Sequence, residues 1–284
     1  MSKKAVVIGA GPAGITSAIY LFRAGVETTV LHNGIGSLEK AEKIENYYGF
    51  PEPVSGEQLF ENGIKQAEKI GIKVLKSQVY SILFNDNFEI TTNEKTYNAD
   101  VVILANGISR NKPQIENFSK YEGNGVSYCA TCDGFFYKGL DVAVLGNSEY
   151  TLHEAAELLP IANNVMIFTN GESKISDDRF VINQKKIKTL LGQDSLEEVE
   201  FEDGEKIKID GLFVAMGVAS GTDLAKKIGI ITDDKGGIQV DENQKTNIPG
   251  IFAAGDCTRG LLQVSKAVSE GAVAAKSAIA YLRK

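Results

Sequence analysis

The sequence predicts an α/β protein made of two Rossmann-like nucleotide-binding domains, the second of which is degenerate and inserted into the first. Three observations lead to this prediction. A strand, a glycine-rich loop and a helix open the chain, and strand-like and helix-like segments then alternate along it. Near the C-terminus the chain returns to an apolar strand that ends in Gly-Asp, followed by an Ala-rich helix pattern. Such alternation is typical of parallel sheets covered by helices.

The composition bounds the kind of protein. The 284 residues suffice for one large domain or two of ordinary size, and 43% hydrophobic with 24% charged residues is usual for a globular chain. A net charge of −7 argues against a general role in nucleic-acid binding. No apolar run is long enough to span a bilayer, and no signal-peptide core follows the N-terminus. We therefore expect a cytoplasmic protein without a membrane partner.

The first strand–loop–helix unit carries a phosphate-binding pattern. Val6 to Ile8 predict a buried strand, residues 9–14 read GAGPAG, and Ile15 to Phe22 predict a helix. In a GxGxxG loop the first glycine allows the tight turn, the second admits a pyrophosphate, and the third lets the helix pack on the strand. The helix N-terminus adds partial positive charge. The unit predicts a dinucleotide site at Gly9, Gly11, Pro12, Ala13 and Gly14.

The second strand departs from the usual pattern at its end. Many dinucleotide sites have an acid there that binds a ribose hydroxyl, whereas this chain has Leu31-His32-Asn33. His32 or Asn33 is a candidate for that hydrogen bond, and a solvent-facing turn is an equally good interpretation. Periodicity then predicts a helix over 55–71, short strands within 72–84, 87–92 and 96–107, and further strands at 142–146, 164–171 and 210–218.

The predicted domain boundaries follow from this order of elements. Residues 1–112 and 244–284 form one discontinuous domain, and 113–243 form the inserted one. The segment TNIPGIFAAGD at 246–256 resembles the C-terminal flavin signature of the pyridine nucleotide-disulfide reductase superfamily. By that resemblance Asp256 holds the ribityl chain of FAD, and Gly255 lets the backbone approach it. Two such motifs in one split domain favour FAD over NAD.

A cysteine pair is the most specific feature of the inserted domain. Cys129 and Cys132 are separated by two residues and followed by Asp133. Two thiols at this spacing can close a disulfide at a helix start, where one pKa is lowered. In a reducing compartment the spacing indicates redox or metal chemistry. Without a second CxxC, and with only two histidines in the chain, we expect no metal site.

Together these segments resemble the low-molecular-weight thioredoxin reductase family over nearly the whole chain. The resemblance rests on the two flavin motifs, on CATCDG at 129–134, and on IENYYGFPEPVSG and QVSKAVSEGAVAA. It implies that Cys132 faces the flavin, that Cys129 attacks the disulfide of thioredoxin, and that Asp133 is the acid or base. It also implies a homodimer, with Asn46 and Gln263 near the flavin, although Leu262 stands where the family has an arginine.

The inserted domain lacks a usable NADPH loop. Where an NADPH-dependent relative has GxGxxA, residues 146–151 read GNSEYT. Ser148 and Thr151 replace small residues, and Glu149 adds a carboxylate near the expected phosphates. No Lys or Arg lies in 161–172 to bind a 2′-phosphate. We therefore do not expect NADPH to be the electron donor.

The pattern is most similar to the ferredoxin-dependent flavin thioredoxin reductases, which makes reduced ferredoxin the expected donor. Lys185, Lys186 and Lys188 form a candidate basic patch for an acidic ferredoxin or, equally, a solvated face. Three alternatives remain open: an FAD-dependent dithiol oxidase that uses oxygen, an NADPH-dependent reductase with a divergent site, and a flavin redox sensor.

Overall fold

The computed structural model describes residues 2–107, 113–172, 175–216, 221–233 and 236–284. The chain divides into two compact units, unit 1 of residues 1–109 and 220–284 and unit 2 of residues 110–219. The described residues 221–233 and 236–243, predicted to belong to the inserted domain, group with unit 1. Helix α5, Gly221–Lys227, packs beside the small sheet of unit 1, where Lys227 Nζ donates to the carbonyl of Tyr80 at 3.3 Å.

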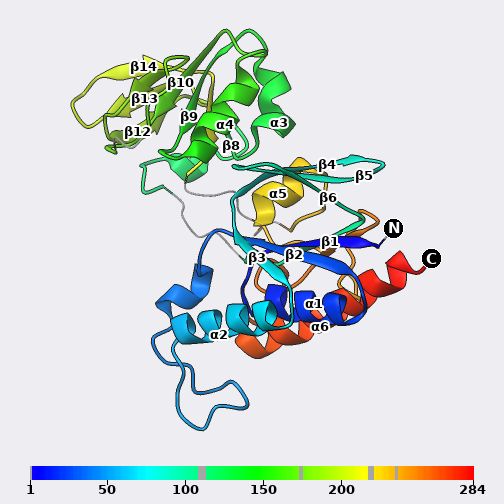
Figure 1. The fold of residues 1–284 in the computed structure, drawn as a ribbon. Helices are drawn as coiled ribbons and strands as arrows, with labels where there is room; N and C mark the ends of the chain where they lie inside the picture. Colours follow the sequence, from blue (N-terminus) through cyan, green and yellow to red (C-terminus); the bar gives the residue numbers. More distant parts are fainter. Residues whose placement is uncertain (1, 108–112, 173–174, 217–220, 234–235) are drawn as a thin grey trace. The chain divides into compact units, whose positions relative to one another are not determined.

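Unit 1 has three layers (Figure 1). A five-stranded parallel sheet with the order β16-β7-β1-β2-β3 forms the middle layer, and helices cover one face of it. An antiparallel sheet of β4, β5 and β6 lies on the other side. The elements are β1 Lys4–Ile8, α1 Pro12–Arg23, β2 Glu27–His32, α2 Gly56–Lys69, β3 Lys73–Lys76, β4 Val79–Asn85, β5 Asn87–Thr92, β6 Thr96–Ala99, β7 Val101–Leu104, β16 Ile251–Ala253 and α6 Val264–Leu282.

Helices α1 and α6 approach each other closely because small residues meet at their crossing. A Cβ atom on Gly271 would lie 2.3 Å from the carbonyl oxygen of Ala13. The buried hydroxyl of Ser17 is 3.0 Å from the carbonyl oxygen of Gly271 and 2.8 Å from that of Ala13. This contact fixes the start of α1, with its glycine loop, against the helix that follows the Gly255–Asp256 turn.

Unit 2 also contains a five-stranded parallel sheet, in the order β11-β10-β9-β15-β8, and a second antiparallel sheet of β12, β13 and β14. Helix α4 connects β9 to β10, whereas no helix is described between β10 and β11. The elements are β8 Val126–Ser127, α3 Ala130–Asp133, β9 Asp141–Leu145, α4 Glu149–Leu158, β10 Asn164–Phe168, β11 Val181–Asn183, β12 Ile187–Leu191, β13 Glu198–Phe201, β14 Lys206–Lys208 and β15 Gly211–Val214. The predicted α/β class with Rossmann-like parallel sheets is confirmed.

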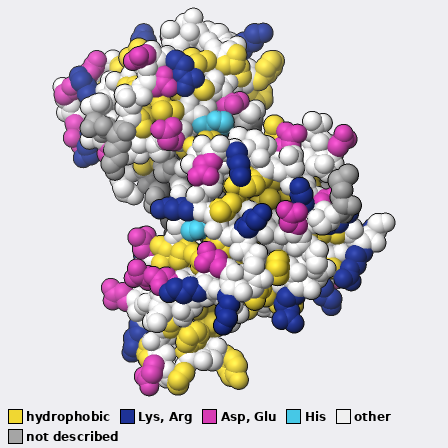
Figure 2. Space-filling view, in the orientation of Figure 1, with side chains coloured by type: hydrophobic (Ala, Val, Ile, Leu, Met, Phe, Trp, Pro, Cys, Tyr) yellow, Lys and Arg dark blue, Asp and Glu magenta, His cyan; other side chains and the backbone are white. Residues whose placement is uncertain are grey.

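Membrane-spanning helices are not part of this fold as far as it is described: none of the helices in those ranges has the length and apolarity to cross a bilayer. On the face shown in Figure 2, acidic and basic side chains are interspersed over both units.

Candidate flavin and disulfide sites

The glycine loop between β1 and α1 has the geometry of a dinucleotide cradle. Gly9 has φ of +111°, and a Cβ atom there would lie 2.3 Å from the carbonyl oxygen of Ala105. A Cβ on Gly14 would lie 1.8 Å from the carbonyl oxygen of Gly9. A Cβ on Gly11, in contrast, would meet no atom of the protein within 4 Å. Packing therefore requires Gly9 and Gly14, whereas Gly11 leaves free space at the helix start that suits a pyrophosphate.

The helix that follows is well prepared for this role. Pro12 occupies the first turn of α1, where its missing N–H costs no hydrogen bond, and Ala13 is buried against the Gly255 turn. No side chain caps the helix at Gly11, so the amides of its first turn are available to a bound anion.

His32 ends β2 with one ring nitrogen already engaged. Its Nδ1 accepts from the N–H of Gly34 at 3.2 Å, and its ring packs edge-on against Phe60, with the centroids 5.6 Å apart. Burial lowers the pKa of His32, and the positive charge of Lys76 adds to this shift. The ring is therefore neutral at neutral pH, and its ribose contact stays a prediction.

Asn46 and Gln263 meet although they are far apart in the sequence. Asn46 Nδ2 donates to Gln263 Oε1 at 2.9 Å. The loop that carries Asn46 is closed by two hydrogen bonds, from Ile44 N–H to Val54 O at 2.9 Å and from Val54 N–H to Ile44 O at 3.2 Å. Gln263 is the N-cap residue of α6. The pair thus joins this loop to the helix that follows the Gly255–Asp256 turn.

The Gly255–Asp256 turn is held by two residues that the sequence analysis missed. Glu270 Oε2 accepts from Gly255 N–H at 2.8 Å and from the hydroxyl of Thr258 at 2.9 Å. Lys266 Nζ donates to the Gly255 carbonyl at 2.9 Å. The two charged groups pair at 3.1 Å with side chains only 14% and 16% exposed. Their i,i+4 spacing, directly after the flavin signature, is the signal that could have found them.

We expect Glu270→Gln to weaken FAD binding about tenfold, or about 1.4 kcal/mol, because it removes the charged acceptor that fixes the turn. Titration of the apoprotein with FAD, followed by flavin fluorescence, measures the dissociation constant. Glu68→Gln on the exposed face of α2 is the matched control and should leave it unchanged. Unaltered FAD affinity in a folded Glu270→Gln protein would contradict this role.

The cysteine motif lies directly after β8. Cys129 is buried and disulfide-bonded. Its N–H donates to Ser127 Oγ at 3.1 Å, and that hydroxyl in turn donates to Asp133 Oδ2 at 2.6 Å. Ser127 therefore links Asp133 to the backbone of the motif. The side chain of Cys132 lies outside the described part of the structure, so the assigned roles of Cys129, Cys132 and Asp133 stay predictions.

Other residues near this motif were not predicted from the sequence. Glu154 on α4 is buried, and its Oε2 accepts from the N–H of Ala130 at 3.3 Å. Phe135 and Phe136, immediately after the motif, are 73% and 77% exposed. Large apolar side chains that remain exposed beside a redox pair are a candidate contact surface for a protein partner.

The third cysteine has a structural environment. Cys257 is a free, buried thiol 3.4 Å from the Leu104 carbonyl oxygen and 3.3 Å from that of Ala254. Burial raises its pKa to about 12, so the reactive thiolate is suppressed. Within the described ranges, no group of three or more His, Cys, Asp or Glu side chains could hold a metal ion.

The loop after β9 is closed by its own side chains. Gly146 keeps the role of Gly9, since a Cβ there would lie 2.2 Å from the Ala215 carbonyl oxygen. The N–H of Ser148 donates to Thr151 Oγ1 at 3.1 Å, as in a capping box, and the Thr151 hydroxyl donates to the Ala215 carbonyl at 2.8 Å. Thr151 is fully buried. The amide of Ser148, at the position equivalent to Gly11, is thus already bonded within the loop by Thr151.

A second contact joins this loop to the one after β10. Asn147 Nδ2 donates to Glu172 Oε2. In a Rossmann-like unit the adenosine part of a nucleotide lies beside these two loops. The hydrogen bond therefore draws a carboxylate to the place where a 2′-phosphate would need cations.

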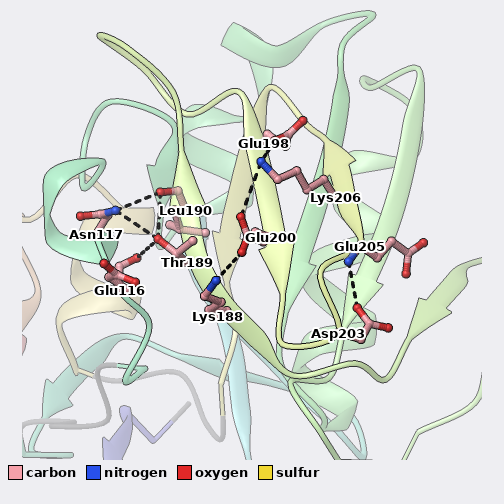
Figure 3. Close-up of polar contacts among 10 residues, drawn as sticks. All are labelled: Glu116, Asn117, Lys188, Thr189, Leu190, Glu198, Glu200, Asp203, Glu205 and Lys206. Atoms are coloured by element: carbon pink, nitrogen blue, oxygen red, sulfur yellow. Dashed lines mark hydrogen bonds and ion pairs between the residues drawn. The ribbon is translucent and has the colours of Figure 1, made fainter.

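The lysines proposed as a basic patch are each paired with carboxylates. Lys185 pairs with Asp203 at 2.6 Å and with Glu205, and Lys186 pairs with Glu202 at 2.8 Å. Lys188 pairs with Glu200 at 2.5 Å, and Figure 3 shows the ladder that continues to Lys206 and Glu198. The acids come from β13 and the turn after it. The segment is therefore a solvated, mixed-charge face and not a positive surface.

The comparisons with known proteins give the family. A model of the pyridine nucleotide-disulphide oxidoreductases matches residues 3–177 and 179–271, and the chain belongs to this family. A thioredoxin reductase of Listeria innocua is 31% identical over 98% of this chain and 93% of that protein. A 34.2 kDa protein in the rubredoxin operon of Clostridium pasteurianum is 33% identical over 98% of this chain and 96% of that protein.

Solved structures agree with this assignment. The atypical thioredoxin reductase TRi of Desulfovibrio vulgaris Hildenborough superposes with a TM-score of 0.92 at 40% identity, over 99% of this chain and 98% of that chain. A ferredoxin-flavin thioredoxin reductase of Clostridium acetobutylicum gives a TM-score of 0.74 at 31% identity, over 100% and 99% of the two chains. The predicted family is confirmed, and with it FAD as the cofactor, which the open cradle at Gly11 fits.

Proposed function

We propose that this protein is an FAD-dependent thioredoxin reductase that takes its electrons from reduced ferredoxin and not from NADPH. The observation that carries the choice of donor is the contrast between two loops at equivalent places. The space at Gly11 is free, whereas the Ser148 amide is bonded to Thr151. When bound, FAD supplies a two-electron carrier that can accept electrons singly and deliver them as a pair.

The disulfide exchange assigns a role to each residue of the motif. Reduction breaks the Cys129–Cys132 bond, consumes two electrons and, with the uptake of one proton, leaves Cys132 as a thiol and Cys129 as a thiolate. The Cys129 thiolate attacks one sulfur of the thioredoxin disulfide, forming a mixed disulfide and expelling the other sulfur as a thiolate. Asp133, held by Ser127, protonates that thiolate. Cys132 then attacks Cys129, which restores the disulfide and releases reduced thioredoxin.

The donor assignment has electrostatic and energetic support. Residues 161–172 contain no cation for a 2′-phosphate, and Glu172 is bonded to Asn147. Ferredoxins at about −400 mV lie about 130 mV below thioredoxin, so a two-electron transfer releases about 6 kcal/mol. The similarity to a ferredoxin-flavin thioredoxin reductase points the same way. The family resemblance also leads us to propose a cytoplasmic homodimer.

Anaerobic reduction of the bound flavin tests the donor. Reduced ferredoxin is expected to bleach the flavin absorbance, and oxidised thioredoxin added afterwards is expected to restore it. NADPH in excess is expected to leave the absorbance unchanged. Bleaching by NADPH would support the divergent-site alternative, and peroxide formation from a small dithiol in air would support the oxidase. Reduction without repeated turnover of thioredoxin would favour the redox sensor.

Ser148→Gly alone is expected not to confer NADPH use. The backbone amide at position 148 can still donate to Thr151 in this variant, and Glu172 still stands where cations are needed. Stopped-flow absorbance under anaerobic conditions should show no flavin bleaching by NADPH. Efficient NADPH turnover by this single variant would overturn the donor assignment.

Truncation of the two exposed aromatic residues beside the disulfide is expected to impair recognition of thioredoxin. Phe135→Ala with Phe136→Ala should raise the KM for thioredoxin about tenfold, as loss of an aromatic anchor does in other interfaces. The rate of flavin reduction should be unchanged. Phe84→Ala, at a residue 68% exposed in unit 1, is the matched control. An unchanged KM would exclude these residues from the contact.

A further inference from the structure

Glu154 is chemically unusual in its surroundings. Among the residues whose side chains the structure describes, it is the one charged residue that is buried, with 2% of its surface exposed. Burying a carboxyl group is costly unless hydrogen bonds compensate it. A carboxyl group buried on the second turn of α4 therefore indicates specific polar partners.

One hydrogen bond of Glu154 lies within the cysteine motif. Its Oε2 accepts from the N–H of Ala130, the residue directly after Cys129. The neighbouring amide, that of Cys129, donates to Ser127 Oγ. Two successive amides of the motif are thus bonded to side chains. Because α4 packs against α3, Glu154 is held against the first turn of the helix that carries the motif.

The helix that carries Glu154 is itself fixed at its start. Thr151, one turn earlier in α4, is buried. Its hydroxyl donates to the carbonyl of Ala215, the residue directly after β15. In an NADPH-dependent relative the start of this helix borders the nucleotide site. Here it is hydrogen-bonded to Ala215 instead. The same helix brings Glu154 to the backbone of the cysteine motif.

We propose that the negative charge of Glu154 lowers the reduction potential of the Cys129–Cys132 disulfide, an inference that rests on the proposed function. A nearby carboxylate disfavours the negative charge that a thiolate brings to the reduced motif. Glu154 therefore stabilises the disulfide relative to the reduced form. The consequence is a dithiol that gives up its electrons to thioredoxin more readily.

The test compares Glu154→Gln with Glu157→Gln, which lies on the exposed side of the same helix. Each holoprotein is equilibrated in dithiothreitol buffers of graded potential, and its thiols are counted by alkylation and mass spectrometry. Glu154→Gln keeps an acceptor for Ala130 and removes the charge. It should shift the dithiol-to-disulfide ratio about tenfold toward the dithiol, or about 30 mV. Glu157→Gln should match the wild type.

A further variant separates charge from structure. Glu154→Asp keeps the charge but shortens the side chain that reaches Ala130. Its reduction potential should therefore differ less from the wild-type value than that of Glu154→Gln. The reverse order, or a wild-type potential in folded Glu154→Gln, overturns the inference. If the wild-type protein itself fails to reduce thioredoxin, the proposed function fails instead, so the two failures are distinguishable.

Discussion

Cys129→Ser is expected to abolish thioredoxin reduction while ferredoxin still reduces the flavin. The serine hydroxyl cannot attack a disulfide at neutral pH, so the mixed disulfide never forms. Loss of a nucleophile removes most of the catalysis, and we expect turnover to fall on the order of 10³-fold or more. Steady-state thioredoxin turnover and anaerobic flavin absorbance, measured on the same preparation, separate the two half-reactions.

The third cysteine provides the matched control for this experiment. Cys257→Ser keeps a hydrogen-bond donor toward the Leu104 and Ala254 carbonyls and changes a thiol whose pKa is about 12. It should turn over thioredoxin at the wild-type rate. Normal turnover by Cys129→Ser would show that another group attacks the partner and that the assigned roles are wrong.

Substituting valine at Gly11 or at Gly14 of the same loop is expected to impair the protein in two different ways. In Gly14→Val, even the Cβ atom of the new side chain would lie only 1.8 Å from the Gly9 carbonyl oxygen. Relieving such an overlap costs about 3 kcal/mol or more, and the apoprotein should be destabilised by that amount. Gly11→Val meets no protein atom within 4 Å, and its φ of −71° suits any residue. Its apoprotein should therefore melt like the wild type.

The two variants differ again when FAD is added. Gly11→Val should bind FAD at least about a hundredfold more weakly, because the side chain enters the space kept for the pyrophosphate. Thermal unfolding of the apoprotein and FAD titration are the two measurements. If Gly11→Val bound FAD with wild-type affinity, the cradle at this loop would not be the flavin site.

Features encoded in short, contiguous segments could be predicted from the sequence. The first glycine loop, the Gly-Asp turn and the CxxC motif each place their residues by local geometry, since a loop of fixed length joins a strand to a helix. The family resemblance placed Asn46 and Gln263 near the flavin, but their hydrogen bond across 217 positions was not predicted. Burial, which selects Glu154 and the Lys266–Glu270 pair, depends on elements that meet only in the folded chain.

Two predictions depended on context that the sequence does not display. The lysines near residue 186 form a basic run in the sequence, but β13 and the following turn bring carboxylates to each of them. Residues 220–243 continue the alternation of strands and helices, so periodicity alone could not assign them to a unit. Their contacts decide the assignment. For example, the N–H of Ile238 donates to the carbonyl of Cys257 in unit 1 at 2.8 Å.

The capped loop at Ser148 and Thr151 also constrains how such a protein could evolve. Replacing Thr151 with a smaller residue would break its bonds to Ser148 and Ala215 and lose about 0.5–2 kcal/mol, the usual value of a helix cap. That loss precedes any benefit, because cations for the coenzyme would still have to arise elsewhere. A route toward pyridine-nucleotide binding at this loop therefore begins with a loss of stability, which opposes the change.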